Sequence, residues 1–339
     1  MIFKIKILFV LIGLILVDVV ALAADSTKVN YIPEIHGTLR AKYELEPEYM
    51  ESRFQVRNAR LSLTGQLAPI VDYKLEADVC DRGEFKMLEA WGRVEIVDNL
   101  KFQAGQMRMP FSVDATRSPH VRFFANRSFI GKQVGNVRGV GAKLAYKIPS
   151  QPLRIEAGVF NTATISNHKV WQKKMSYAGK INYKWKNMKF EAGIESLVPD
   201  SIRINLLDGS VSWNCDRWFV EGEYIYKHYT NDTFDPCHAY NFMVVYTMPL
   251  NKCFFNNISL LGRFDGMTDH SDGYRDENGQ LTLSDQARNR VTVGTTVGRK
   301  FGKLQTDIRL NYEKYFYESD AIVESGDRDK IVLELVLRF

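Results

Sequence analysis

After residue 23 the sequence has no run of about 18 apolar residues, so it predicts no transmembrane helix. Cysteine is also scarce. The four residues Cys80, Cys215, Cys237 and Cys253 include no C-x-x-C pair, which argues against a zinc or redox site. No local motif joins a nucleophile to a base and an orienting residue. These absences predict a chain that is not an enzyme and that holds no metal or cofactor.

The N-terminus has the parts of a secretory signal peptide. Lys4 and Lys6 precede an apolar run over residues 7–20, and Ala21-Leu22-Ala23 supplies a small-residue cleavage site. We predict a signal peptide over residues 1–23 and a short leader over residues 24–34. An exported chain can oxidise its cysteines. Cys215 and Cys253 fall in successive predicted turns at one end of the fold. The sequence therefore allows either a disulfide between them or two free thiols.

The overall charge is mild. The formal net charge is +5, and removing residues 1–23, which contain two lysines and one aspartate, leaves about +4. Nucleic-acid-binding domains usually carry a far more basic face, so we expect no nucleic-acid partner.

From residue 35 to residue 339 the hydrophobic pattern repeats every two residues, which is typical of β-strands. Sixteen strand candidates can be counted. They lie near Ile35–Leu45, Arg53–Leu67, Val71–Val79, Phe85–Val97, Leu100–Met109, Gly139–Ile148, Leu153–Asn161, Lys174–Trp185, Met188–Leu197, Ile202–Trp213, Arg217–Lys227, His238–Met248, Asn257–Asp265, Arg290–Val297, Lys303–Tyr315 and Asp329–Phe339. In the second candidate the apolar parity changes between Val56 and Leu61, which predicts a β-bulge near Asn58.

The two faces of these strands differ in polarity. In Lys303–Tyr315, for example, Ile308 and Leu310 alternate with Arg309 and Asn311. The polar face carries charges on many strands and few large apolar groups. A closed barrel with lipid outside and water inside explains this pattern, and closure leaves no unpaired strand edge in the membrane.

The connections are also sorted by length. Alternate connections such as 98–99 and 186–187 are short, whereas 110–138 and 266–289 are long. Short turns at one end and long loops at the other are typical of outer-membrane barrels, and an even strand count places both termini on the short-turn side, in the periplasm. The alternating final strand ends at Phe339, which resembles the signal read by the bacterial barrel-assembly machinery. Outer-membrane lipid and lipopolysaccharide are then the expected surroundings.

The connection over residues 110–138 is the candidate functional segment. It is far longer than an ordinary connection. We predict that it folds into the barrel and narrows the lumen as a constriction loop; a solvated external loop is the alternative. Its basic residues against a single acid, Asp114, are Arg117, Arg122, Arg127, Lys132 and Arg138. The alternative role for each cation is a salt bridge to a wall carboxylate, and we expect about two of the five to form one.

The chain resembles the phosphate-selective porin O and P family. The resemblance rests on G-Q-M-R-M-P-F-S (105–112), F-F-A-N-R-S-F-I-G-K-Q-V-G-N-V-R-G-V-G (123–141) and R-F-Q-V-R-N-A-R-L-S-L-T-G (53–65). It implies a sixteen-stranded barrel, a homotrimer, a third external loop that folds inward, and the five loop cations as pore-lining residues that favour anions such as phosphate. The predicted lumen is nevertheless mixed, because it also carries the acids Glu89, Glu95, Glu156, Glu191, Glu221, Glu223, Asp307 and Glu313.

The sequence therefore predicts an outer-membrane porin for small hydrophilic solutes that prefers anions. One alternative is a structural or adhesive barrel without an open pore, whose long loops bind a partner. The acid-rich loop over residues 266–289 suits such a role, although its acids lack the spacing of a calcium loop. A barrel enzyme is the second alternative, with His120 two residues after Ser118 as its weak motif.

Overall fold

The computed structural model describes residues 29–135, 138–162, 170–251, 254–318, 321 and 323–339. The predicted signal peptide and Cys253 lie outside these residues. Cys80, Cys215 and Cys237 are free cysteines. The described part of the chain contains no helix that is long and apolar enough to cross a membrane.

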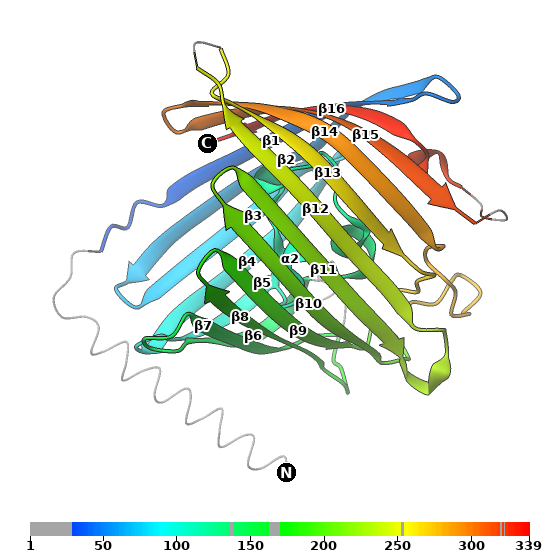
Figure 1. Ribbon diagram of the computed structural model, residues 1–339. Helices are drawn as coiled ribbons and strands as arrows, with labels where there is room; N and C mark the ends of the chain where they lie inside the picture. Colours follow the sequence, from blue (N-terminus) through cyan, green and yellow to red (C-terminus); the bar gives the residue numbers. More distant parts are fainter. Residues whose placement is uncertain (1–28, 136–137, 163–169, 252–253, 319–320, 322) are drawn as a thin grey trace.

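Sixteen antiparallel strands of the described chain form one closed ring (Figure 1). Their order follows the sequence, and β1 pairs with β16 to close the ring. The strands are β1 (Glu34–Glu46), β2 (Glu51–Ala68), β3 (Val71–Asp81), β4 (Glu84–Val97), β5 (Leu100–Arg108), β6 (Arg138–Lys147), β7 (Leu153–Phe160), β8 (Ser176–Trp185), β9 (Met188–Leu197), β10 (Ile204–Cys215), β11 (Trp218–Tyr229), β12 (Cys237–Pro249), β13 (Asn257–Met267), β14 (Arg288–Phe301), β15 (Leu304–Tyr317) and β16 (Lys330–Arg338).

The predicted all-β barrel and its strand count are confirmed, with small changes at the strand ends. β14 extends from Arg288 to Phe301 and is longer than predicted. Arg138 is the first residue of β6 and not the last residue of the loop. The predicted bulge is also confirmed: Ala41 pairs with Val56 and Arg40 with Asn58, so Arg57 is the extra residue. This extra residue moves the apolar parity of β2 by one position and keeps its apolar side chains on one face.

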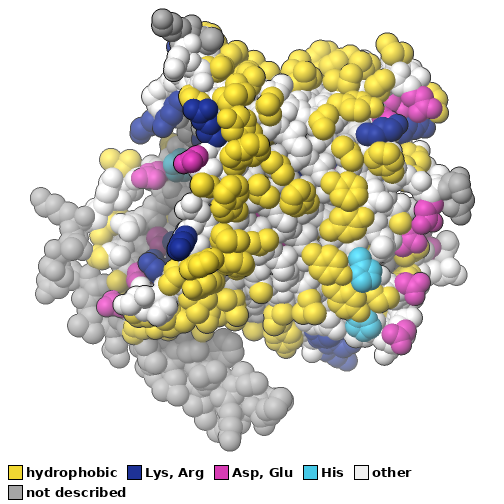
Figure 2. Space-filling view, in the orientation of Figure 1, with side chains coloured by type: hydrophobic (Ala, Val, Ile, Leu, Met, Phe, Trp, Pro, Cys, Tyr) yellow, Lys and Arg dark blue, Asp and Glu magenta, His cyan; other side chains and the backbone are white. Residues whose placement is uncertain are grey.

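The alternation in sequence becomes two faces of the barrel wall. On β15, Asp307, Arg309, Asn311 and Glu313 are buried, whereas Leu310 is 46% exposed. Figure 2 shows apolar side chains covering much of the outer surface. A wall with apolar groups outside and polar groups inside matches lipid on one side and water on the other.

Short helices occur only between strands in the described chain. They are α2 (Val113–Thr116), η1 (Pro119–Val121), η2 (Ile130–Val134), η3 (Thr230–Asp232) and η4 (Ser325–Asp327). The first three belong to the connection between β5 and β6, which we call the β5–β6 segment (residues 109–137, described up to Gly135).

Candidate functional site

The β5–β6 segment begins as a capped helical turn on the wall. The hydroxyl of Ser112 accepts a hydrogen bond from the backbone N–H of Ala115 and donates one of 2.6 Å to Glu223 on β11. The same carboxylate accepts the backbone N–H groups of Val113 (2.7 Å) and Asp114 (3.1 Å). Glu223 therefore satisfies the first N–H groups of α2, which have no partner within the helix.

The segment also contacts the wall far from its own strands. The backbone N–H of Phe129 donates to Asp265 on β13 (3.0 Å), and that of Ala125 donates to Asn311 on β15 (2.8 Å). In the ring of sixteen strands, β13 lies eight strands from β5. The Phe129–Asp265 contact therefore joins two opposite sides of the ring.

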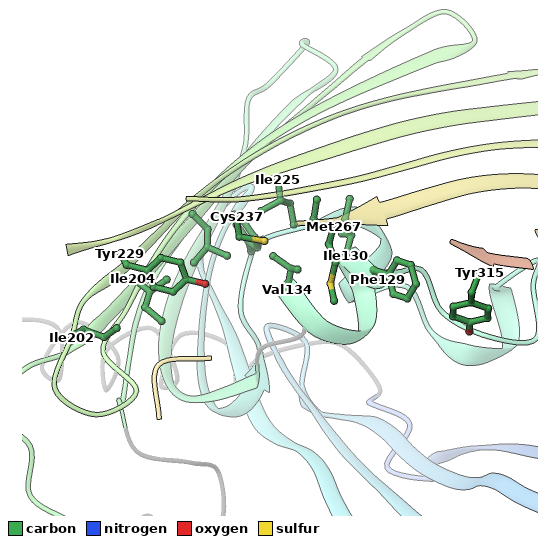
Figure 3. Packing of buried hydrophobic residues seen from close by; sticks show 13 residues of the cluster. Phe129, Ile130, Val134, Ile202, Ile204, Ile225, Tyr229, Cys237, Met267 and Tyr315 are labelled. Carbon is green, nitrogen blue, oxygen red and sulfur yellow. The ribbon is translucent and has the colours of Figure 1, made fainter. Parts of the chain in front are cut away.

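Apolar packing holds the segment against the wall (Figure 3). Phe111, Phe129, Ile130 and Val134 of the segment share one buried cluster with wall residues. The wall residues of this cluster are Ile204, Leu206, Ile225, Tyr229, Cys237, Ala239, Met267 and Tyr315. Complete burial of one large apolar side chain contributes roughly 1.5–3 kcal/mol. The prediction of few large apolar groups on the polar face is thus wrong for β10–β13, because there the face is covered by the segment and not by water.

Two of the five predicted cations form ion pairs. One guanidinium nitrogen of Arg117 lies 2.6 Å from each carboxylate oxygen of Glu221 on β11, and the other lies 3.2 Å from Asp114. Lys132 lies 3.8 Å from Asp327 of η4. Wall and loop acids therefore compensate these two charges.

The other three predicted cations have no ion pair with a described carboxylate. Arg122 is buried and donates to the carbonyl of Arg117 (2.8 Å), and Arg127 donates to the carbonyl of Ala115 (2.8 Å). Arg138 pairs in register with Arg108 across β5 and β6. Within the described chain, the buried Nε of each of these three predicted arginines has no hydrogen-bond partner.

The structure adds two arginines to these three. Arg60 on β2 and Arg108 on β5 also have one buried guanidinium nitrogen without a hydrogen-bond partner in the described chain, but both form ion pairs, Arg60 with Asp78 (2.9 Å) and Arg108 with Glu89 (3.3 Å). We call Arg60, Arg108, Arg122, Arg127 and Arg138 the arginine cluster. Burial and the nearby charges of Arg108, Arg138 and Arg60 lower the pKa of Arg127. A guanidinium stays protonated at neutral pH, so the cluster concentrates positive charge and unpaired N–H donors.

Asp114 is an acid within reach of this cluster, and it is ionised. Burial opposes its ionisation, but the charges of Arg117 and Arg122 and a hydrogen bond from Ser128 outweigh burial and lower its pKa to about 2. Its carboxylate is occupied by Arg117 and by the Ser128 hydroxyl (2.5 Å). Asp114 therefore joins Arg117 and Ser128 within the β5–β6 segment.

Two cavities lie along the segment. The first, the basic cavity, is at the long-loop end of β1 and β2, and its charged lining has ten basic residues and two acids. These are Arg40, Lys42, Arg53, Arg57, Arg82, Arg122, Arg127, Lys132, Arg290 and Lys330, with Glu44 and Asp327. The second, the terminal cavity, lies at the short-turn end and includes Arg60, Glu76, His120, Arg338 and Phe339. Members of the arginine cluster line both cavities.

The strand arginines of these cavities are functional candidates that sequence reasoning missed. Arg53, Arg57 and Arg60 lie in the stretch R-F-Q-V-R-N-A-R of β2, which carried the family resemblance. Their spacing, corrected for the bulge at Arg57, could have placed them on the lumen face. Nothing in the sequence indicated that they face the β5–β6 segment.

The eight predicted lumen acids all have polar partners. The pairs are Glu89 with Lys74 and Arg108, Glu95 with Lys101, Glu156 with Lys143, Glu191 with Lys180, Glu221 with Arg117, Glu223 with the segment backbone, Asp307 with Arg309, and Glu313 with Arg290. Two further buried acids, Glu195 and Asp208, have carboxylate oxygens without a hydrogen-bond partner in the described chain. The arginine cluster therefore faces a wall whose predicted acids are mostly compensated.

Comparison with known proteins agrees with this architecture. A family model described as phosphate-selective porin O and P matches residues 36–192, which confirms the resemblance over that part of the chain. No curated protein matches significantly.

Several solved structures share the fold, although only about one residue in ten is identical. An anion-selective porin from Comamonas acidovorans is 10% identical, with a TM-score of 0.63 over 91% of this chain and 98% of that chain. The trimer form of OmpT of Vibrio cholerae (in-vitro folded) is 10% identical, with a TM-score of 0.60 over 91% and 98%. The outer membrane channel DcaP of Acinetobacter baumannii is 10% identical, with a TM-score of 0.59 over 91% and 97%. The family match and these structures agree on a porin-type β-barrel.

Proposed function

We propose that this chain, which matches the phosphate-selective porin O and P family over residues 36–192, is an outer-membrane porin that passes small anions such as phosphate. The β5–β6 segment is its constriction, and the arginine cluster is its anion-contacting site. The short-turn end faces the periplasm and the long loops face outward. A homotrimer is the proposed assembly, by analogy with the trimeric Vibrio cholerae barrel.

The observation that carries the proposal is a set of guanidinium nitrogens that have no hydrogen-bond partner. Five arginines from β2, β5, β6 and the segment each have a buried N–H without a partner in the described chain. An arginine fork can donate two parallel hydrogen bonds to a phosphate or carboxylate group. Two unit charges about 4 Å apart attract by roughly 1 kcal/mol in water and about 4 kcal/mol near a protein surface. A few such contacts favour anion entry and repel cations.

The pairing of the acids on the barrel wall also supports a preference for anions over cations. Isolated lumen acids would attract cations, but the eight predicted acids are paired with lysines, arginines or backbone N–H groups. A passing anion therefore meets the charges of Arg122, Arg127 and Arg138, which have no ion pair with a described carboxylate. The ion pair of Arg117 with Glu221 removes one predicted cation from this role.

The test is the reversal potential of the reconstituted protein in a planar bilayer under a salt gradient. The wild-type protein should give a stable conductance with anion preference. The Arg122→Gln/Arg127→Gln variant should move the reversal potential toward cations and weaken the block of chloride current by added phosphate. The matched control is Arg154→Gln/Arg299→Gln, which removes the same charge at the short-turn ends of β7 and β14 and should leave selectivity unchanged.

Three other outcomes would contradict the proposal or support an alternative function. A protein without stable conductance would support the structural or adhesive barrel. Cation preference in the wild-type protein would contradict the proposed site. Hydrolytic turnover that is lost in His120→Asn would support the enzyme.

A further inference from the structure

We propose that Arg40, Arg263 and Arg290 are positioning residues that determine selectivity without contacting the anion. We call these three residues the arginine clamp, and residues 124–129 of the β5–β6 segment its tip. The inference rests on the proposed function, because it explains how the anion-contacting arginines are held in place.

The arginine clamp binds three consecutive backbone carbonyls of the tip. Arg40 of β1 donates to the carbonyl of Ala125 (2.5 Å), Arg263 of β13 to that of Asn126 (2.9 Å), and Arg290 of β14 to that of Arg127 (2.6 Å). Three strands on one side of the ring therefore fix three successive residues of a chain that starts on the other side.

Backbone N–H groups and rings complete this attachment. Asn311 and Asp265 accept the N–H groups of Ala125 and Phe129. The guanidinium carbon of Arg263 lies 4.5 Å from the ring centre of Phe124, and that of Arg290 lies 4.5 Å from the ring centre of Phe129. Cation–π contacts of this kind add to the hydrogen bonds. The wall thus holds the tip through its backbone and its phenylalanines.

This mode of attachment leaves the tip arginine free for the lumen. The carbonyl of Arg127 is bound by the wall, whereas its side chain reaches the carbonyl of Ala115 and belongs to the arginine cluster. A shift of the tip would therefore move Arg127, and with it the position of the charge that an anion meets. Arg122 lies two residues before the tip and would follow.

The charges of the arginine clamp are compensated, which separates its role from that of the arginine cluster. Arg40 lies 2.6 Å from Glu334, Arg263 lies 3.2 Å from Asp265, and Arg290 lies 2.8 Å from Asp265. All three side chains are buried. Arg40 uses Nε and both terminal nitrogens for Glu334, Asn58 and Ala125. Arg40 and Arg290 therefore have few donors left for a passing anion, whereas the buried Nε of Arg263 forms an ion pair with Asp265 without a hydrogen bond.

Lysine is the informative replacement because it keeps the charge and loses the planar fork. A single ammonium group cannot reproduce the carboxylate pair, the carbonyl bond and the ring contact together. The Arg40→Lys/Arg263→Lys/Arg290→Lys variant therefore has the wild-type lumen charge but a loosened tip. The matched control is Arg93→Lys/Arg154→Lys/Arg275→Lys, whose arginines pair with Asp72, Glu156 and Asp200 and belong to neither the arginine cluster nor the basic cavity.

The experiment compares single-channel recordings of wild-type, clamp and control proteins. We expect the clamp variant to lose at least half of the wild-type anion preference in reversal potential and to show larger current fluctuations. The control should match the wild type. A clamp variant with wild-type reversal potential and noise would overturn the inference. So would lower thermal stability or yield with unchanged selectivity, since that pattern indicates a purely structural role.

Failure of the two proposals can be told apart. The wild-type recording alone tests the anion-preferring porin, and the ratio of clamp to wild type tests the positioning role. If the triple variant does not assemble, Arg263→Lys alone is measured, since it leaves the bonds of Arg40 and Arg290 in place. It should give a smaller shift in the same direction, and an unchanged reversal potential in this single variant also overturns the inference.

Discussion

One guanidinium nitrogen of Arg117 lies 2.6 Å from both carboxylate oxygens of Glu221, although the two residues are 104 positions apart in the chain. The Glu221 side chain is buried, and that of Arg117 is 12% exposed. Arg117 also bonds Asp114 at 3.2 Å, so it joins the start of the β5–β6 segment to β11. A residue that the sequence presents as a pore cation therefore acts mainly as an attachment of the segment.

This relationship predicts that Arg117 matters more for stability than for selectivity. Arg117→Gln leaves Glu221 and Asp114 without their partner, and breaking a buried ion pair from one side costs about 3–5 kcal/mol. We expect a clear loss of resistance to thermal unfolding in detergent, with a smaller reversal-potential shift than Arg122→Gln/Arg127→Gln gives. Arg117→Gln/Glu221→Gln should regain part of the stability, because neither residue is then left charged and unpaired. Equal stability of the single and double variants would argue against the pair.

Gly131 provides a steric test of the segment. A Cβ at this position would lie 2.2 Å from a carboxylate oxygen of Asp114, which is the physical reason for glycine here. Gly131→Ala should displace Asp114 from Ser128 and destabilise the barrel by about 1–3 kcal/mol. The control Gly262→Ala adds a Cβ where nothing lies within 4 Å and should leave the unfolding temperature unchanged.

His120 predicts a pH dependence of selectivity. Burial, and then the charge of Arg338, lower the pKa of His120 to about 4, with Arg60 and Arg108 acting in the same direction and Glu76 against it. His120 is therefore neutral at neutral pH and gains its proton near pH 4. Its protonation adds a positive charge beside Arg60 and Arg338 in the terminal cavity, which should increase anion preference.

The measurement compares the wild type with His120→Asn, at neutral pH and at about pH 4. Acids that titrate in both proteins cancel in the difference, so only the wild type should show the extra anion preference. The stability contribution has a defined sign as well. Because the folded-state pKa lies below the ordinary value of 6.5, this contribution is complete above 6.5 and is lost as the pH falls through about 4.

Phe339 predicts a difference between assembly in cells and refolding in detergent. Its backbone N–H and carbonyl pair with Gly37 at 3.1 and 3.0 Å, and its ring occupies the space of a Cβ at Gly37. The ring is 55% exposed, so little packing is lost in Phe339→Ala. If the terminal aromatic residue is read by the barrel-assembly machinery, the variant should reach the outer membrane several-fold less well and yet refold normally in detergent. Equal losses in both assays would indicate a packing role only.

Much of the barrel could be predicted because its signals are local. Alternation in stretches such as Asp307–Glu313 assigns one face to lipid and one to water, and the parity change between Val56 and Leu61 indicated the bulge observed at Arg57. The basic character of the β5–β6 segment was also visible. The packing of its apolar residues Phe111, Ile130 and Val134 against the wall could not be predicted. Their partners on β10–β13 have the pattern of ordinary strand residues, and only the structure shows that the segment covers them.

The sequence by itself determined the ring of strands, since alternation, turn spacing and the need to pair every backbone group in a membrane are properties of short stretches. Only the tertiary structure decided which cations are free. Arg117 meets Glu221 and Arg290 meets Asp265 and Glu313, while Arg122, Arg127 and Arg138 have no acid among the described residues at ion-pair distance. The energy between charges depends on their separation in space, and separation along the chain does not reveal it.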